Sequence, residues 1–338
     1  MFSKELLLTS DYNRVTTGAW TSSGQIGDYG AVSVVYGYDV TYGDSFYCCD
    51  SNGTQYRSTD GITWTGTHGY TAGTMEHGRV FCVNGRFITF ASTQTLDTVK
   101  YTVTYLIDGH YSLDLPSSVN MHVDGACYFN GKYYIAGTQN GLGVVRYSAD
   151  LVDWSESLEW DITLDTTAIN SMATDGTCIV ISANGGIYTS VDGLNFEKTM
   201  SGSSLYPQII YAKDRFIAVE ITGLDVFYLW QSFDGYEWTR TLTSFNRFSG
   251  FNCIAYGLNK FVIGTTINNT VFGSPNPYNA KFYTSLDPND PAHAGWHTQT
   301  SNTLNGVNAI AYGNGRFVAV NENSPYTYSC SYKLWGIE

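Results

Sequence analysis

The stretch Ser58-Thr-Asp-Gly-Ile-Thr-Trp64 decides how this chain is organised. It returns as Ser190-Val-Asp-Gly-Leu-Asn-Phe196 and Ser232-Phe-Asp-Gly-Tyr-Glu-Trp238, and more loosely as Ser148-Ala-Asp-Leu-Val-Asp-Trp154 and Ser329-Cys-Ser-Tyr-Lys-Leu-Trp335. Each copy places an aromatic residue four positions after an aspartate, or after a serine in the last copy. Repetition of a short unit along a chain is typical of propellers and solenoids, so the repeat predicts the architecture.

A second repeated phrase, a tight polar turn that leads into an apolar run, accompanies the first. It occurs at residues 43–46, 84–87, 130–133, 175–178, 213–216, 258–261 and 314–317, with a mean spacing of about 45 residues. Asn-Gly and Asp-Gly, which occupy several of these turns, are the strongest short hairpin signals because both central residues need positive φ. A period of about 45 residues is the length of a four-stranded propeller blade.

We therefore predict an all-β fold, a single seven-bladed β-propeller of four-stranded antiparallel blades, because a closed ring leaves no long sheet edge exposed. The blades are expected at residues 32–68, 76–115, 122–160, 167–200, 206–243, 250–300 and 305–338. The second blade has lost its tryptophan, and the sixth carries an insertion from Asp287 to Gly295 before Trp296. In the last blade, residues 334–337 are expected to form the fourth strand.

Residues 1–31 form an N-terminal arm that holds half of a repeat. Asp11 and Trp20 in this arm have the same spacing as Asp287 and Trp296. Two roles are open for the arm: it closes the ring against the last blade, or it docks onto another molecule. A propeller needs its termini joined, which favours closure.

The composition agrees with a large β protein and excludes several partners. Aromatic residues make up 15% of the chain, and the 35 glycines far outnumber the 7 prolines, which favours strands and tight turns. The formal net charge is −13. Nucleic acids and anionic membrane surfaces require a basic face, so neither is expected as a partner. No phosphate-binding or dinucleotide motif is present, so no cofactor is expected.

The seven cysteines show no spacing typical of a zinc site, and we expect buried free thiols at Cys82, Cys127, Cys178 and Cys253 in a protein assembled in a reducing cytosol. Asp287, Asn289 and Asp290 offer oxygen ligands, but their neighbouring prolines fit a plain turn and no EF-hand spacing occurs, so no metal site is predicted. The sequence also predicts no signal peptide and no transmembrane segment.

These repeats resemble the Asp-box, or BNR, repeat of sialidase-like β-propellers, whose pattern is Ser-x-Asp-x-Gly-x-x-Trp. The turn is one residue shorter here, as in propeller repeats of phage and bacterial proteins. The resemblance covers residues 32–338 and implies an architectural box: its Asp and Ser hydrogen-bond within the turn between the third and fourth strands, and its aromatic residue packs between blades. The expected structural box residues are Ser58, Asp60, Trp64, Asp150, Trp154, Asp192, Phe196, Asp234, Trp238, Asp287, Trp296 and Trp335.

Sialidase chemistry would require an arginine cluster, a general acid and a nucleophile. The Phe-Arg-Ile-Pro signature of sialidases is absent. Arg86, Arg215 and Arg316 occupy the same hairpin position in three repeats, which indicates a structural role. We therefore assign no catalytic residues and expect that the chain is not an enzyme.

In a propeller of this kind, the hairpins and the Asp turns lie on one face of the ring. The opposite face carries the ends of the second strands, expected at Asp50, Ala91, Gly137, Ser182, Glu220, Thr265 and Asn321, and the starts of the first strands, expected at Gly37, Gly78, Asp124, Asn170, Pro207, Asn252 and Asn308. Polar residues at these positions often only cap turns. The alternative is a polar channel mouth that hydrogen-bonds sugar hydroxyls or holds a cation, with Asp50, Glu220, Asn321, Asp124, Asn170, Asn252 and Asn308 as the binding candidates.

The leading hypothesis is a non-enzymatic structural or recognition propeller of a larger assembly, a phage tail or host-attachment protein of the virion, assembled in the host cytoplasm. Its partners would be other virion proteins. The alternative is a glycan-binding or glycan-cleaving, sialidase-like propeller with a cell-surface glycan at the channel mouth. A third reading is a host cytoplasmic assembly factor built on the same repeat. Tyr-rich surfaces suit both protein interfaces and sugar stacking.

Overall fold

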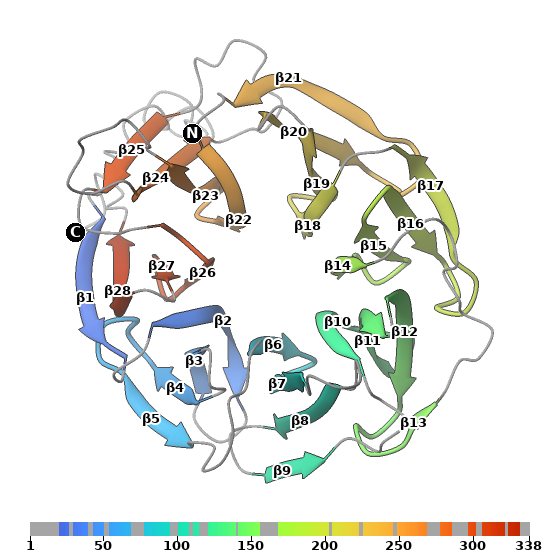
Figure 1. Ribbon diagram of the computed structural model, residues 1–338, viewed down its shortest axis with the longest axis horizontal. Helices are drawn as coiled ribbons and strands as arrows, with labels where there is room; N and C mark the ends of the chain where they lie inside the picture. The colour runs from blue at the N-terminus through green and yellow to red at the C-terminus, as the bar shows by residue number, and fades with distance from the viewer. Residues whose placement is uncertain are drawn as a thin grey trace, which may run out of the picture.

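Seven four-stranded antiparallel sheets stand around a central axis in this computed structural model (Figure 1). The predicted all-β propeller fold is confirmed. The structure describes residues 20–26, 30–39, 43–50, 54–68, 78–94, 101–107, 111–114, 121–139, 141–155, 168–202, 205–222, 226–245, 249–268, 278–285, 297–301, 306–321 and 324–331. All elements in this part of the chain are strands.

The first four blades follow the chain in order. Blade 1 consists of β2 (Ala31–Asp39), β3 (Gly43–Asp50), β4 (Gln55–Ser58) and β5 (Thr65–His68). Blade 2 consists of β6 (Arg79–Val83), β7 (Arg86–Gln94), β8 (Tyr101–Ile107) and β9 (Tyr111–Asp114). Blade 3 consists of β10 (His122–Phe129), β11 (Lys132–Gln139), β12 (Leu142–Ser148) and β13 (Trp154–Ser155), and blade 4 of β14 (Ile169–Thr174), β15 (Ile179–Ala183), β16 (Gly186–Ser190) and β17 (Glu197–Ser201).

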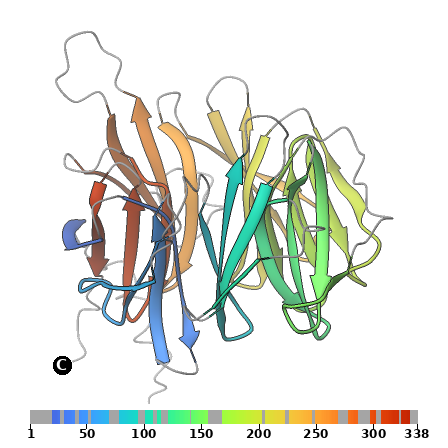
Figure 2. The ribbon, with the colours of Figure 1, turned by 60° about the horizontal axis from the view of Figure 1, so that its bottom comes forward.

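The last three blades complete the ring, and the first strand of every blade lies nearest the axis (Figure 1). Figure 2 shows the same ring tilted by 60°. Blade 5 consists of β18 (Leu205–Ala212), β19 (Arg215–Thr222), β20 (Val226–Ser232) and β21 (Thr239–Phe245). Blade 6 consists of β22 (Ser249–Gly257), β23 (Lys260–Asn268), β24 (Tyr278–Ser285) and β25 (His297–Ser301). Blade 7 consists of β26 (Ala309–Gly313), β27 (Arg316–Asn321), β28 (Ser324–Ser331) and β1 (Thr21–Gln25).

The N-terminal segment closes the ring. β1 pairs antiparallel with β28, so the outer strand of blade 7 comes from the start of the chain. The sequence repeat placed that strand at residues 334–337, which lie outside the described residues; the position beside β28 is occupied by β1 instead. β1 also lies against blade 1, since a Cβ atom on Gly24 would come within 2.9 Å of Cδ1 of Trp64.

The turns between first and second strands have the expected hairpin geometry. Both central residues have positive φ in the turns at 84–85, 130–131, 213–214, 258–259 and 314–315. Blade 4 differs, because Thr174 pairs with Ile179 across a longer loop. Blade 1 differs too: Asp39 pairs with Gly43, so its first strand extends beyond the usual hairpin position.

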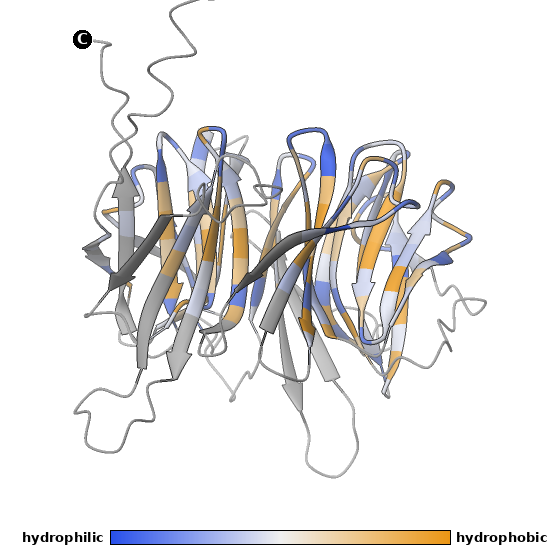
Figure 3. Ribbon diagram, turned by 90° about the horizontal axis from the view of Figure 1, so that it is seen from above, coloured by the Kyte–Doolittle hydropathy of each residue, from blue (hydrophilic) through white to orange (hydrophobic). Residues whose placement is uncertain are grey.

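The hydrophobic core consists of seven clusters, one at each boundary between neighbouring blades. Apolar residues occupy the middle of the blades, and polar residues are frequent in the turns at one face (Figure 3). The second strands are covered on both sides, so all five residues of Ile179–Ala183 are buried, and four of the five are apolar. Three of the four expected buried thiols are confirmed, because Cys127, Cys178 and Cys253 are buried and form no disulfide; Cys82 is only half-buried.

The box hydrogen bonds recur from turn to turn. In the first box, the Ser58 hydroxyl donates to Asp60 Oδ1 (2.9 Å) and accepts from the Gly61 amide (2.8 Å), while the Ile62 and Thr63 amides donate to Asp60 Oδ1 at 2.8 and 2.7 Å. Equivalent networks are centred on Asp150, Asp192 and Asp234. These are the contacts that the Asp-box resemblance implies.

Each described box aromatic packs at the boundary with the preceding blade. Trp64, Trp154, Phe196 and Trp238 join the clusters at the 7|1, 2|3, 3|4 and 4|5 boundaries respectively. Trp20 follows the same rule at the 6|7 boundary, where its ring stacks on Phe282 with 3.9 Å between centroids. The half-copy in the N-terminal arm therefore supplies the box tryptophan of the last blade.

The loose copy of the repeat in blade 3 forms its Asp turn without a glycine. The glycine of the other boxes has positive φ, and a Cβ on Gly61, for example, would lie 2.6 Å from Val318 Cγ2. Leu151 occupies the same position at φ 68°, which costs a residue with a side chain backbone strain. Its side chain is 1% exposed within the 2|3 cluster, and this burial offsets the strain.

Candidate functional site at the channel mouth

The two faces of the ring differ in what they present. The hairpins and the Asp turns share one face, as the hydrogen bond from Asn314 Nδ2 to the Thr59 carbonyl (3.0 Å) demonstrates. The first strands begin on the opposite face. There the first strands of all seven blades enclose a cavity of about 260 Å³ on the axis of the ring. We call this the channel mouth.

The starts of the first strands are irregular, which brings extra residues to the mouth. A register shift occurs between Val123 and Gly125 in β10, and similar shifts occur in β2, β14, β18 and β22. Bulges of this kind re-aim side chains and are frequent next to functional sites. They place Asp124, Asn170, Pro207 and Asn252 in the lining, together with Asn308 from blade 7.

The position expected for blade 1 is wrong. Counting back from the hairpin aromatic selects Gly37, but the hairpin of blade 1 is longer than the others and Phe46 pairs with Tyr36. The residue that matches Asp124 is therefore Val32, which lines the channel mouth. Val34 and Val35 extend this apolar side of the lining.

The amide side chains at the mouth connect neighbouring blades. Asn170 Nδ2 donates to the Tyr206 carbonyl of blade 5 (3.0 Å) and to Asn184 Oδ1 (3.0 Å). Asn252 Nδ2 donates to the Val307 carbonyl of blade 7. Gln208, one position further along its strand, hydrogen-bonds the main chain of blade 6 through both its amide atoms. Much of the predicted polarity at the mouth is therefore structural.

Three of the predicted binding residues do not line the cavity. They lie at or near the ends of second strands, one strand further from the axis, and their exposed fractions are 1% for Asp50, 8% for Glu220 and 3% for Asn321. Asp50 Oδ1 accepts from the Thr54 amide (2.8 Å), and Glu220 Oε2 accepts from Trp230 Nε1 (2.7 Å). Asn321 Nδ2 donates to Asn308 Oδ1 (3.1 Å) and so supports a lining residue. Assigning these three to the mouth was wrong, because side chains there are enclosed by neighbouring strands.

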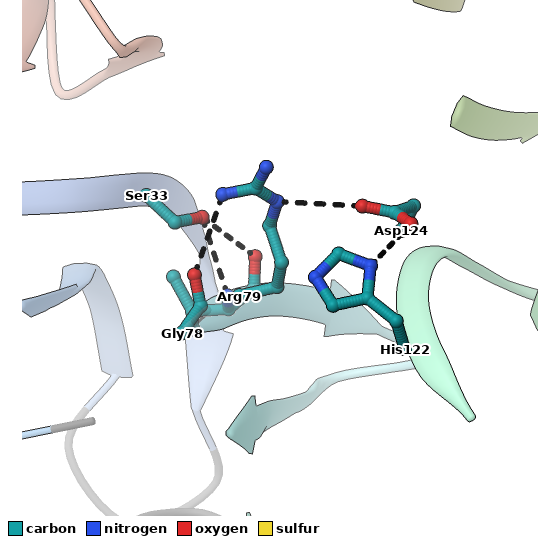
Figure 4. Close-up of polar contacts among 6 residues, drawn as sticks. Ser33, Gly78, Arg79, His122 and Asp124 are labelled. Atoms are coloured by element: carbon teal, nitrogen blue, oxygen red, sulfur yellow. Dashed lines mark hydrogen bonds and ion pairs between the residues drawn. The ribbon is translucent and has the colours of Figure 1, made fainter. Parts of the chain in front are cut away.

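A charged cluster stands out between blades 2 and 3 (Figure 4). His122 Nδ1 lies 2.6 Å from Asp124 Oδ2, and Arg79 Nε of blade 2 lies 3.9 Å from Asp124 Oδ1 of blade 3. The Arg79 side chain is 39% exposed and that of Asp124 is 15% exposed. Ser33 holds the start of β6 in place, since its hydroxyl hydrogen-bonds both the amide and the carbonyl of Val80.

Of this cluster, sequence reasoning selected Asp124 and missed Arg79 and His122. Arg79 directly follows the aligned strand-start position Gly78, and the matching positions in the other blades hold Ser33, Gly125, Ser171, Gln208, Cys253 and Ala309. An arginine that breaks the repeat at a channel-facing position was the available signal. Among the described residues that line the cavity, Arg79 has the single guanidinium and Asp124 the single carboxylate.

Several predicted residues lie outside the described residues. They are Asp287, Trp296 and Trp335, together with the Asp287–Asp290 loop considered as a metal site. Within the part of the chain that the structure covers, no group of three or more His, Cys, Asp and Glu side chains could hold a metal ion. None of the described elements is a helix that could span a membrane.

Comparison with known proteins supports the fold. No family model and no curated protein sequence matches this chain. Among solved structures, it is similar to the extracellular domain of a protein described as a one-component system from B. thetaiotaomicron (TM-score 0.62, 12% identity, 94% of this chain and 40% of that chain). It is also similar to YCF48 bound to a D1 peptide (0.61, 12%, 94% and 99%) and to the WD40 propeller domain of Doa1 (0.59, 12%, 95% and 100%). At these identities the likeness shows a β-propeller fold.

Proposed function

We propose that this chain is a non-enzymatic recognition propeller of a larger assembly and that the channel mouth is its recognition surface. The proposal rests on the contrast between the Asp turns, which repeat from blade to blade, and the channel mouth, which does not. The Asp turns repeat the same hydrogen bonds in blades 1, 3, 4 and 5, whereas the mouth gathers unlike residues and one charged cluster. Binding specificity requires such a departure from symmetry, because identical positions around a ring present identical chemistry.

The non-enzymatic part of the proposal is supported by the chemistry of the lining. Glycosidases place two carboxyl groups on either side of the scissile bond, roughly 5 to 9.5 Å apart. The described lining holds one carboxylate, Asp124, which is already engaged by His122. Glu220 and Asp50, the other two acids that the sequence predicted as binding residues at the mouth, are buried and hydrogen-bonded within their own blades.

We further propose that the repeats are Asp boxes of the shortened phage and bacterial type and that the assembly is a virion tail or attachment structure. The box hydrogen bonds support the first statement. The second rests on the composition of the chain, which combines 27 tyrosines and 15% aromatic residues with few charged residues (14%). Tyr-rich surfaces form protein interfaces at a low entropic cost.

The test is to produce the tagged full-length chain together with the proteins encoded on either side of its gene and to isolate it at physiological salt. We expect co-purification at a fixed stoichiometry, lost or weakened in Asp124→Asn. Thr59→Ala, which alters an exposed residue on the opposite face, is the matched control and should behave like the unaltered chain. A chain that stays alone in the presence of every neighbour would contradict the proposal.

A glycan array with the same protein examines the alternative partner. The mouth cavity of about 260 Å³ lies below the roughly 300–1,000 Å³ typical of small-molecule pockets, which disfavours an oligosaccharide. We expect no specific binding. Strong binding of one glycan class that Asp124→Asn abolishes would replace the assembly proposal with the glycan reading.

A further inference from the structure

We infer that the channel mouth binds a single carboxylate group through Arg79, an inference that rests on the proposed role of the mouth as the recognition surface. Arg79 is the one guanidinium among the described lining residues, and it is the first residue of β6. Its function is not accounted for by the repeat, because no other blade has a cation at the matching position.

The guanidinium of Arg79 has more N–H donors than the described residues around it accept. Its Nη1 lies 3.5 Å from the Gly78 carbonyl, and its Nε lies 3.9 Å from Asp124 Oδ1, which is longer than a hydrogen bond. Figure 4 shows one terminal nitrogen facing the Gly78 carbonyl and the other directed away from it. Most of the N–H donors of this side chain therefore lack an acceptor among the described residues, and a planar guanidinium matches a carboxylate in a two-bonded geometry.

The neighbouring residues His122 and Asp124 position the Arg79 side chain. His122 fixes Asp124 at 2.6 Å, and Asp124 faces the Nε edge of the guanidinium. Other blade boundaries at the mouth are connected by neutral hydrogen bonds, such as those from Ser33 to Val80 and from Gln208 to Ile254. The 2|3 boundary is instead spanned by a long charged contact, which leaves the guanidinium able to turn toward a ligand. His122 and Asp124 are thus positioning residues.

Charge and volume restrict the ligand to a monoanion. Asp124 already places a negative charge beside Arg79, so a dianion such as a phosphate monoester would be repelled more strongly than a carboxylate. The net charge of −13 acts in the same direction. The cavity volume of about 260 Å³ accommodates a small acid or one acidic side chain.

The decisive measurement is the NMR line width of ¹³C-labelled acetate in the presence of the full-length chain at constant ionic strength, with acetamide as the neutral control. We expect saturable broadening of acetate alone. In Arg79→Gln the affinity should fall by roughly 10- to 100-fold, since charged hydrogen bonds are lost. Arg86→Gln, which removes an arginine from the opposite face of the same blade, should leave it unchanged.

A second variant covers the case in which Arg79→Gln does not fold. Arg79→Lys keeps the charge but loses the two-bonded geometry, so it should bind acetate more weakly than the unaltered chain. Where Arg79→Gln folds, Arg79→Lys should bind acetate more tightly than Arg79→Gln. The two sources of the carboxylate are separated by blocked tripeptides with a central Glu or Gln. Tighter binding of the Glu peptide than of acetate assigns an acidic side chain of a partner protein; equal binding assigns a small free acid.

Absence of saturable acetate broadening, equal broadening of acetamide, or unchanged affinity in folded Arg79→Gln would each overturn the inference. None of these results by itself contradicts the proposed function. If co-purification with the assembly still depends on Asp124, the mouth is a recognition surface for a different chemistry; if it does not, the proposed function fails on its own terms.

Discussion

The two faces of this ring are built by opposite uses of the same repeat. On the Asp-turn face, Ser58, Ser148, Ser190 and Ser232 make one and the same set of contacts. At the channel mouth, the matching strand-start positions hold Val32, Gly78, Asp124, Asn170, Pro207, Asn252 and Asn308. A position that repeats serves every blade alike, and a position that varies serves one place in the ring.

Under the proposed function, the difference between the faces separates stability from recognition. Box side chains cap turns and pack between blades, so their loss affects folding. The charged cluster of Arg79, His122 and Asp124 lies partly open to the cavity, and exposed charge pairs contribute little to stability. Substitutions on the first face should therefore change the free energy of unfolding, and substitutions on the second should change binding.

The largest expected effect follows from removing a box tryptophan. Trp154 is 7% exposed in the 2|3 cluster, and Trp154→Ala should lower the free energy of unfolding by about 3–5 kcal/mol because it leaves a large cavity. Urea denaturation followed by tyrosine fluorescence and circular dichroism measures the change. A loss below about 1 kcal/mol would show that the boundary does not depend on its aromatic.

A smaller effect is expected from the box serine. Ser232→Ala removes the acceptor of the Gly235 amide (2.8 Å) and a donor to Asp234 (3.0 Å), so a buried N–H loses its partner at a cost of about 1–3 kcal/mol. Thr59→Ala, at an exposed position of another box, is the matched control and should change the free energy of unfolding by less than about 0.5 kcal/mol. Equal losses of unfolding free energy in the two variants would contradict the stabilising role of the serine in the turn.

Acid should weaken the same face. Hydrogen bonds from the Glu237 and Tyr236 amides lower the pKa of Asp234 below its ordinary value, against a smaller rise from burial. For Asp192, burial raises the pKa, but hydrogen bonds from Asn195 and Leu194 outweigh it and the net pKa is lowered. A carboxyl with a depressed folded pKa stabilises the fold above its unfolded pKa of about 3.9, and this contribution is lost as the pH falls through the folded pKa.

Denaturation midpoints between pH 5 and roughly pH 2 test this statement. Stability should fall with decreasing pH, and the fall should be shallower in Asp192→Asn, which keeps an oxygen acceptor but does not titrate. An unchanged slope in Asp192→Asn would assign the acid sensitivity to other carboxyl groups.

The smallest effect on stability is expected at the mouth. Asp124→Asn retains an oxygen for His122 and loses only the contact with Arg79, so the free energy of unfolding should change by less than about 1 kcal/mol. Co-purification with the proposed assembly should nevertheless be lost or weakened in this variant. A destabilisation as large as that of Trp154→Ala would make the cluster a structural element and remove the distinction between the faces.

The fold was predictable from the sequence because its signals are local. Asn84-Gly85 and its counterparts specify hairpins by backbone sterics, and the Ser-x-Asp turns carry their own hydrogen-bond partners within a few residues. The outer strand of blade 7 was not predictable in the same way. β1 pairs with β28 across almost the whole chain, and the loose copy ending in Trp335 gave a competing local signal.

The site was predictable only in part, for a physical reason. Repeat counting located Asp124, Asn170, Asn252 and Asn308 at the mouth but could not anticipate burial, so Asp50 and Glu220 were given the same role. A longer hairpin shifted the count in blade 1. Arg79 appears in the sequence only as a break in the repeat, and its proximity to Asp124 depends on how two adjacent blades pack. His122 carries no repeat signal.

The most direct test of the central claim is hydrogen–deuterium exchange of the full-length chain, alone and in its assembly. The account predicts slowed exchange at the starts of β6 and β10, around Arg79 and His122, and unchanged exchange in the box turns at residues 190–196 and 232–238. Protection confined to those turns, with the mouth unaffected, would contradict the assignment of recognition to the varied face.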